Sequence, residues 1–109
     1  MPAIIGGDLN SNERSLAHEM LRCGGFFNAA SHADVRSMHC SEHGDPKRGA
    51  DGKYHGSLCP AKDDTPDRSI DHIYYTKSIH VLRHEIIIDQ YALDVSDHSP
   101  VLVEFTMER

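Results

Sequence analysis

The segment Ala3-Ile4-Ile5-Gly6-Gly7-Asp8-Leu9-Asn10 decides the fold of this chain. Its first three residues form an apolar run typical of a buried strand, and the two glycines predict a tight turn where that strand ends. Asp8 and Asn10 follow this turn directly. Because strand ends are rigid and the loops beside them carry binding and catalytic side chains, the segment predicts that a strand delivers these two polar residues to a site.

A helix is predicted after this segment, so that residues 1–25 fold as strand, loop and helix. Ser11 or Asn12 would cap the helix, and Glu13 would lie near its positive end. Gly24-Gly25 would end the helix. The apolar residues that recur at helical spacing are Leu16, Ala17, Met20 and Leu21.

The middle of the chain loses this periodicity. Residues 26–30 would form a short strand or a turn, and residues 31–68 are rich in His, Gly, Asp, Pro and Lys without a helical or strand repeat. A loop of that length is usually functional or mobile. We therefore expect one partial domain over residues 1–109, with a long loop at about 31–68.

Extended structure returns near Ser69. The stretches predicted as strands are residues 70–76, 79–83, 85–88 and 101–106. In the last of these, apolar and polar residues alternate, which is typical of a half-buried strand. Residues 90–96 are predicted to connect the strands.

The composition is that of one small domain. The chain has 109 residues, of which 39% are hydrophobic, so it can form a modest core. Its formal net charge is −6, and an acidic surface repels a polyphosphate backbone unless cations or a local basic patch compensate. The same acidity suits a site that gathers carboxylates around a divalent cation.

The sequence leaves the cellular location undecided. No apolar run approaches the ~20 residues that span a membrane, and the first five residues lack the basic and long apolar regions of a signal peptide. If the native chain begins upstream, cytoplasmic and secreted locations both stay open. Three cysteines are too few for a disulfide framework, so a Cys40–Cys59 bridge and the redox compartment are undecided too.

Three short clusters carry residues suited to phosphate chemistry. They are Gly7-Asp8-Leu9-Asn10, Ile70-Asp71-His72 and Ser96-Asp97-His98-Ser99-Pro100, each at the predicted start or end of a strand. Hydrolysis of a phosphate ester needs a hard cation on the phosphate oxygens, a group that orients or deprotonates water, and donors for the developing charge. Aspartate, asparagine and histidine supply those functions.

In this order the clusters resemble motifs of the endonuclease/exonuclease/phosphatase superfamily. Gly7-Asp8-Leu9-Asn10 is similar to its G-D-[FL]-N motif, Ser69-Ile70-Asp71-His72-Ile73 to its [RS]-[IL]-D-[YH]-[IF] strand, and Ser96-Asp97-His98-Ser99-Pro100-Val101 to its S-D-H-x-P-V motif. The resemblance covers nearly the whole chain and corresponds to the carboxy-terminal half of the family's domain. Members include pancreatic deoxyribonuclease-like and apurinic-site nucleases, sphingomyelinases and inositol-polyphosphate phosphatases.

The resemblance implies a role for each matching residue. Asp8 would position or deprotonate the attacking water, and Asn10 would bind the scissile phosphate. Asp97 would be the metal ligand, directly or through water. His98 would contact the phosphate or act as acid or base, and Asp71 would hold its imidazole in orientation. The cofactor would be Mg²⁺ or Mn²⁺, and the substrate either nucleic acid or a small phosphate ester.

The family's fold is a four-layer α/β/β/α sandwich, so the resemblance implies an α+β chain with one mixed sheet and a helix layer. The first half of such a domain supplies an Asn and a Glu to the metal, and nothing before Asp8 can do so here. We therefore expect an incomplete domain with little activity alone, completed by a missing amino-terminal half or a second copy. The residues expected on the uncovered sheet face are Ile4, Ile73, Tyr75, Val101, Val103 and Phe105.

Other interpretations concern the remaining histidines and cysteines. Spacings compatible with four zinc ligands belong to Cys40, His43, His55 and Cys59. A non-catalytic zinc-binding or partner-binding module is therefore the alternative function, and a degenerate half-domain without activity is a third. His72 is expected to be a strand residue without a role. The histidines expected to face solvent are His18, His32, His80 and His84.

Overall fold

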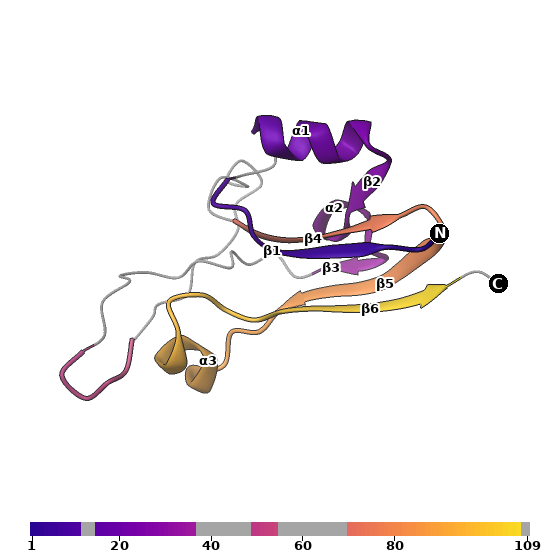
Figure 1. Cartoon of the computed structure of the whole chain (residues 1–109). Helices are drawn as coiled ribbons and strands as arrows, with labels where there is room; N and C mark the ends of the chain where they lie inside the picture. Colours follow the sequence, from indigo (N-terminus) through magenta and orange to yellow (C-terminus); the bar gives the residue numbers. More distant parts are fainter. Residues whose placement is uncertain (12–14, 37–48, 55–69, 108–109) are drawn as a thin grey trace.

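The structure is a computed structural model that describes residues 1–11, 15–36, 49–54 and 70–107. Over these ranges the chain forms an α+β fold of two three-stranded sheets and three short helices (Figure 1). The predicted α+β class is confirmed. The expectation of one mixed sheet was too simple, because the strands divide between two sheets, of which only the second mixes parallel and antiparallel pairs.

The first sheet holds two of the three motifs. It has the order β1-β4-β2 and is antiparallel throughout. The strands are β1 (Ile4–Asp8), β4 (Asp71–Thr76) and β2 (Phe26–Asn28). The register pairs Asp8 at the end of β1 with Asp71 at the start of β4. The two carboxylates therefore lie at the same end of the sheet.

The second sheet has the order β3-β5-β6. Its strands are β3 (Val35–Arg36), β5 (Ile79–Ile86) and β6 (Val101–Met107). The predicted stretches 79–83 and 85–88 are mostly one strand, in which the register shifts between Val81 and Arg83. This irregularity interrupts the two-residue alternation of buried side chains, whereas the two predicted stretches were divided at His84, which lies inside the strand. Strand β3 lies inside the stretch predicted as a loop.

Helix α1 (Leu16–Cys23) confirms the predicted helix and its glycine stop, where Gly25 has a φ of 90°. Its N-cap position is held by Ser15 and not by Ser11 or Asn12. The apolar stripe of this helix does not face the core as such stripes usually do. The side chains of Leu16 and Met20 are 70% and 67% exposed, and the buried residue of the helix is His18.

The other two helices are short and have capped starts. Helix α2 (Ala29–His32) begins after Asn28, whose side chain accepts a hydrogen bond from the Ala30 N–H at 3.0 Å. Helix α3 (Gln90–Val95) begins after Asp89, which accepts from the Ala92 N–H at 2.8 Å. Much of the segment predicted as a connection is therefore a helix with an aspartate cap.

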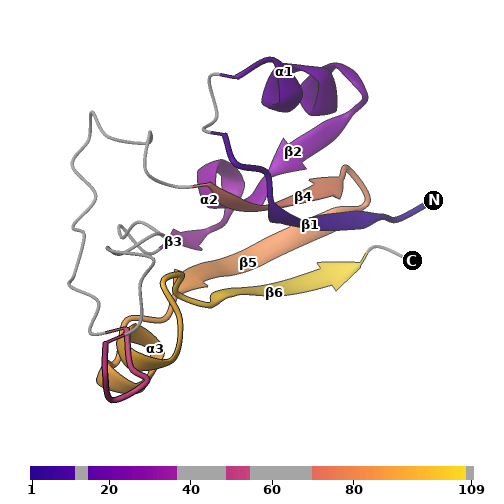
Figure 2. The ribbon, with the colours of Figure 1, turned by 60° about the vertical axis from the view of Figure 1, so that its left-hand side comes forward.

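The core lies between the two sheets and is closed on one side by α2. Helix α1 lies outside the first sheet, and α3 lies at the opposite end of the molecule from the two termini (Figure 2). The buried cluster and the side chains packed against it are Ala29, Ala33, Tyr75, Ile79, Val81, Ile73 and Val103. Three of the six residues expected on an uncovered face are therefore covered by the chain itself.

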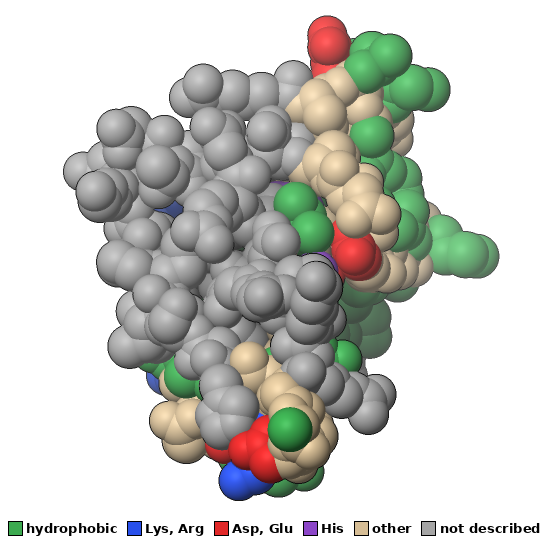
Figure 3. Space-filling view, turned by 90° about the vertical axis from the view of Figure 1, so that its left-hand side faces the viewer, with side chains coloured by type: hydrophobic (Ala, Val, Ile, Leu, Met, Phe, Trp, Pro, Cys, Tyr) green, Lys and Arg blue, Asp and Glu red, His purple; other side chains and the backbone are tan. Residues whose placement is uncertain are grey.

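Apolar side chains remain exposed on β1 and β6, each of which is an edge strand of its sheet. Ile4 in β1 is 43% exposed, and Phe105 and Met107 in β6 are 42% and 57% exposed. Within the described residues, β1 pairs only with β4, and β6 pairs only with β5. Figure 3 shows hydrophobic side chains along one border of the described surface, with acidic side chains beside them.

None of the helices in the described part of the chain has both the length and the apolar character that a membrane span requires.

Candidate active site

Two sheets bring the three sequence motifs to one place. Strand β1 ends at Asp8 and β4 begins at Asp71, and the antiparallel register sets these residues opposite each other. The third motif, Ser96 to Pro100, leads from α3 into β6. Its backbone is held at the start by the His98 N–H, which donates to the Ser96 hydroxyl at 3.1 Å, and at the end by the pairing of Val101 with Ile86.

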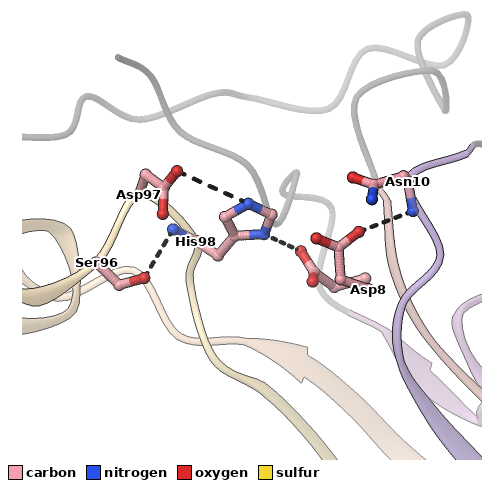
Figure 4. A network of polar contacts seen from close by, with 6 residues as sticks. Asp8, Asn10, Ser96, Asp97 and His98 are labelled. Atoms are coloured by element: carbon pink, nitrogen blue, oxygen red, sulfur yellow. Dashed lines mark hydrogen bonds and ion pairs between the residues drawn. The ribbon is translucent and has the colours of Figure 1, made fainter. Parts of the chain in front are cut away.

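His98 and Asp71 form the central contact of the site. The Nδ1 of His98 lies 2.5 Å from Oδ2 of Asp71, and the two side chains are 26% and 19% exposed. Because a carboxylate only accepts, Nδ1 carries the hydrogen of this bond. The other ring nitrogen, Nε2, lies 4.0 Å from Oδ2 of Asp97. Figure 4 shows the imidazole between Asp97 on one side and Asp8 on the other.

The surroundings of His98 favour its charged form. Burial alone lowers the pKa of the imidazole. The hydrogen bond and the negative charge of Asp71 act in the opposite direction, and the charges of Asp97 and Asp8 add to them. The carboxylates prevail, so the pKa of His98 is raised above the ordinary histidine value.

The loop after β1 is folded tightly around Asp8. The N–H of Asn10 donates to Oδ1 of Asp8 at 2.8 Å, and the Leu9 N–H donates to the Ile70 carbonyl at 2.9 Å. Asn10 has a φ of 48°, in the left-handed region that asparagine tolerates better than most residues. In Figure 4 the Asn10 side chain lies beside Asp8, on the side away from His98.

Three of these residues form a group that could hold a metal ion. Asp8, Asp71 and His98 each offer one ligand atom, and these three atoms lie within 4.8 Å of one another. Two carboxylates suit a hard divalent cation, whose six or more ligands are mostly oxygens. The donor set therefore fits part of a coordination shell, and the remaining ligands would be water, substrate or other protein groups. Asp97, the predicted ligand, is not in this group.

A cleft of about 330 Å³ opens beside these residues. Among the described residues that line it, none is Lys or Arg. Its lining includes Gly7, Asp8, Asp71, His72, Ser99 and Pro100. The cleft is therefore lined by residues of all three motifs, including the two aspartates Asp8 and Asp71.

The structure brings together the site residues that the motifs indicated. They are Asp8, Asn10, Asp71, Asp97 and His98. Their proposed roles stay predictions. The proposed zinc ligands Cys40, His43, His55 and Cys59 lie outside the described residues, so that alternative is untested.

Among the other histidines, the expectation of solvent exposure was half correct. His32 is exposed, and so is His80, whose Nε2 lies 2.7 Å from Asp34 Oδ2. His18 and His84 are instead buried, at 0% and 3% exposure.

Buried residues behind the motif loop were missed by sequence reasoning. His18 contacts Tyr74 through its Nδ1 and the Ser11 carbonyl through its Nε2. His72, expected to be a strand residue, lies in β4 as predicted and packs its ring against His18. The sequence around His18 does not indicate that this residue is buried, because its partner Tyr74 lies 56 residues away in the chain.

Comparisons with known proteins agree with the motif order. No protein-family model and no curated protein matches the sequence. The structure resembles an endonuclease/exonuclease/phosphatase from Bacteroides vulgatus with a TM-score of 0.72 and 27% identity, covering 98% of this chain and 37% of that one. A mannosyl-6-phosphatase from Bacteroides thetaiotaomicron VPI-5482 gives a TM-score of 0.68 and 22% identity, with 98% and 38% coverage.

A further endonuclease/exonuclease/phosphatase family protein, from Bacteroides thetaiotaomicron, matches with a TM-score of 0.70 and 23% identity. It is covered over 39% of its length by 100% of this chain. In each case, then, this chain spans well under half of its structural neighbour. The chain is similar to endonuclease/exonuclease/phosphatase family proteins over nearly its whole length, and it has the fold of a part of their domain.

Proposed function

We propose that this chain carries part of the active site of a divalent-metal-dependent phosphoric ester hydrolase. The observation that supports the proposal most directly is the His98–Asp71 contact at 2.5 Å, with an atom of Asp8 within 4.8 Å of both. An imidazole held by one carboxylate beside a second carboxylate is a constellation suited to proton transfer and phosphate binding.

His98 is the residue proposed to contact the phosphate. Its Nδ1 is engaged with Asp71, so Nε2 is the nitrogen that would donate to a phosphate oxygen or to the leaving group. The raised pKa of His98 favours the charged ring, which stabilises the negative charge that develops on the phosphate. Asp71 would act through this ring, as the carboxylate that fixes its orientation.

Asp8 and Asn10 are proposed to act on the opposite side of the phosphate. Asp8 is exposed to solvent, so its carboxylate can orient or deprotonate an attacking water. Its Oδ1 accepts a hydrogen bond from the backbone N–H of Asn10. The side-chain amide of Asn10 is the group that would bind a phosphate oxygen. The short loop therefore holds both residues in fixed relation to each other.

Among the described residues, Asp8 and Asp71 would hold the cation beside His98, with Asp97 close enough to act through water. A bound Mg²⁺ or Mn²⁺ would polarise the phosphate oxygens and lower the pKa of bound water. Because His98 already donates to Asp71, we assign the imidazole mainly to the substrate and the two carboxylates mainly to the cation.

The electrostatics favour a small phosphorylated substrate over a long nucleic acid. The chain has a net charge of −6, and the described cleft lining has no Lys or Arg. A polyphosphate backbone would gain little from such a surface. A phosphodiesterase or nuclease would need its basic contacts from residues outside those described.

We further propose that a larger domain completes this site. The neighbours are more than twice as long as this chain. A partner segment that completes a four-layer sandwich would cover the exposed apolar side chains of β1 and β6 and would supply the missing metal ligands.

The test is hydrolysis of a phosphate monoester and a phosphate diester of p-nitrophenol with Mg²⁺ or Mn²⁺. We expect weak turnover by the chain alone and a clear increase when a complete domain is assembled. There, His98→Ala should reduce kcat by about 100-fold or more, whereas the matched control His80→Ala at an exposed histidine should not. Retention of full activity in His98→Ala would refute the proposal. Robust turnover by the chain alone would refute only the incompleteness.

A further inference from the structure

The loop that carries Asp8 and Asn10 is held from behind by a buried histidine. His18 on α1 has 0% exposure, and its Nε2 lies 3.1 Å from the carbonyl oxygen of Ser11. Its other ring nitrogen, Nδ1, lies 2.5 Å from the hydroxyl of Tyr74, which is 1% exposed. One side chain thus joins a helix, the loop after β1 and strand β4.

The hydrogen positions follow from the partners. The Ser11 carbonyl can only accept, so Nε2 of His18 carries the hydrogen of that bond. Nδ1 can then accept from the Tyr74 hydroxyl. Both ring nitrogens are satisfied in this arrangement, as buried polar atoms require.

The carbonyl that His18 holds belongs to the residue that follows the motif. Ser11 comes directly after Asn10, whose φ of 48° lies in the left-handed region, which costs asparagine less free energy than most residues but more than glycine. The Ser11 hydroxyl donates to the Leu9 carbonyl at 3.1 Å, which closes the loop on itself. A left-handed residue persists only where its surroundings hold it, and the His18 bond supplies such a hold.

A second buried ring supports the first. The ring of His72 packs edge to face on His18, with centroids 4.4 Å apart and planes at 81°. Asn28 fixes His72: its Oδ1 accepts from the Ala30 N–H, so its Nδ2 donates to Nδ1 of His72 at 3.2 Å. Because His72 follows Asp71 in β4, the same network reaches the strand that carries the His98 partner.

We propose that His18 is a positioning residue, which sets the loop conformation of Asp8 and Asn10 through its Nε2 bond to the Ser11 carbonyl. The expected effect of His18 on catalysis rests on the proposed function, whereas its expected effect on the loop conformation does not. His18 touches none of the reacting groups and acts only through the backbone it holds.

Two substitutions separate positioning from packing. In His18→Gln, the amide nitrogen can take the place of Nε2 and donate to Ser11. In His18→Asn, the shorter amide reaches only the position of Nδ1, so the bond to Ser11 is lost. Both variants replace the ring by a buried amide and differ by one methylene group, whose loss would weaken the whole fold and so also raise exchange in β5 and β6.

The measurement is amide hydrogen exchange of Leu9, Asn10 and Ser11 by NMR on the full chain, with β5 and β6 as internal reference. We expect exchange at Asn10 to rise about tenfold or more in His18→Asn and to stay within about threefold of the original protein in His18→Gln. Equal acceleration in both variants, or none in either, would overturn the proposal.

Tyr74→Phe keeps the proposal testable if His18→Asn does not fold. This change removes the hydroxyl but leaves the ring packing and the Nε2 bond to Ser11. Asn10 should then stay protected. If its exchange accelerated about tenfold while β5 and β6 stayed protected, the hold could not be assigned to the Ser11 bond.

Kinetics connect this hold to the site. In the hydrolysis assay, His18→Asn should lower kcat by about 10- to 100-fold at a nearly unchanged KM, and His18→Gln should recover most of that loss. Exchange needs no turnover. Absence of hydrolysis by a complete domain that contains the original chain would therefore count against the proposed function alone, whereas equal exchange in the two His18 variants would count against the role of His18 alone.

Discussion

At the residue scale, the pKa of the His98 imidazole depends on its hydrogen bond to the Asp71 carboxylate. We predict that Asp71→Asn lowers the pKa of His98, because the amide keeps the shape of the carboxylate but loses its charge. NMR titration of the His98 ring in metal-free buffer measures this directly. Asp34→Asn is the matched control, since Asp34 contacts His80 instead. An unchanged His98 titration in Asp71→Asn would contradict the assigned contact.

His84 provides a second prediction at this scale. Burial is the main reason that its pKa lies below the ordinary value, and the nearby His72 and Arg36 add to the effect. Between the pKa of folded His84 and its ordinary value, the unfolded chain therefore binds a proton at His84 that the folded chain does not. Stability contributed by His84 should be complete above about pH 6.5 and should decrease as the pH falls from there towards the folded pKa.

Thermal unfolding at pH 7.5 and pH 5.5 tests the His84 prediction by difference. His98 has a raised pKa and acts in the opposite sense, so its stabilising contribution is present at low pH and lost as the pH rises. His84→Phe removes only the first contribution. The drop in midpoint on acidification should be smaller in this variant than in the original protein, and an equal or larger drop would show that His84 is not the group responsible.

At the scale of the elements, the different burial of two apolar residues, one in α1 and one in β5, predicts different losses of stability on truncation to alanine. Ile79 in β5 is 5% exposed, whereas Met20 in α1 is 67% exposed. Ile79→Ala should lower the free energy of unfolding by about 2–5 kcal/mol, and Met20→Ala should change it by no more than about 0.5 kcal/mol. Denaturant unfolding measures both. A large loss in Met20→Ala would mean that α1 buries its apolar stripe after all.

The elements also show what the sequence could and could not predict. The strands around Asp8, Asp71 and Val101 were predicted because each is a short apolar or alternating run next to a motif. The first prediction was wrong in detail, because β1 is exposed and continues through Gly6 and Gly7 to Asp8, where a buried strand ending in a turn at the glycines was expected. Helix α3 was missed because its six residues are too few for a helical period to be visible, although Asp89 marks its start. The two-sheet arrangement depends on pairing between distant strands, which local patterns do not encode.

The candidate site likewise contains residues that the sequence predicted and residues that it did not. The motif residues were predicted because their order and context along the chain are specific. His18 was missed because its burial depends on Tyr74, which lies 56 residues away, and a helix residue's own neighbours do not reveal such a partner. Its actual place shows that a polar residue can occupy the inner face of an amphipathic helix when distant groups satisfy both of its ring nitrogens.

At the scale of the whole molecule, the exposed apolar side chains of β1 and β6 predict association. Strand edges that expose apolar residues pair readily with other chains. We expect the chain alone to self-associate at micromolar concentration in sedimentation velocity, and Phe105→Arg in β6 to reduce this association. Tyr91→Arg in α3 is the control, at a residue that is 77% exposed and remote from these edges. A stable monomer with a sharp thermal transition would contradict this prediction.

We propose as the central claim that the carboxylates of Asp8 and Asp71, beside His98, form a cation site for phosphate ester hydrolysis. Its most direct test is a titration of the isotope-labelled chain with Mn²⁺, in which paramagnetic broadening of NMR signals locates the bound ion. We expect the signals of Asp8, Asp71 and the adjacent His98 to broaden first, at substoichiometric Mn²⁺, and Asp8→Asn combined with Asp71→Asn to abolish this effect. Broadening centred on Cys40, His43, His55 and Cys59, or spread evenly over surface acids, would contradict it.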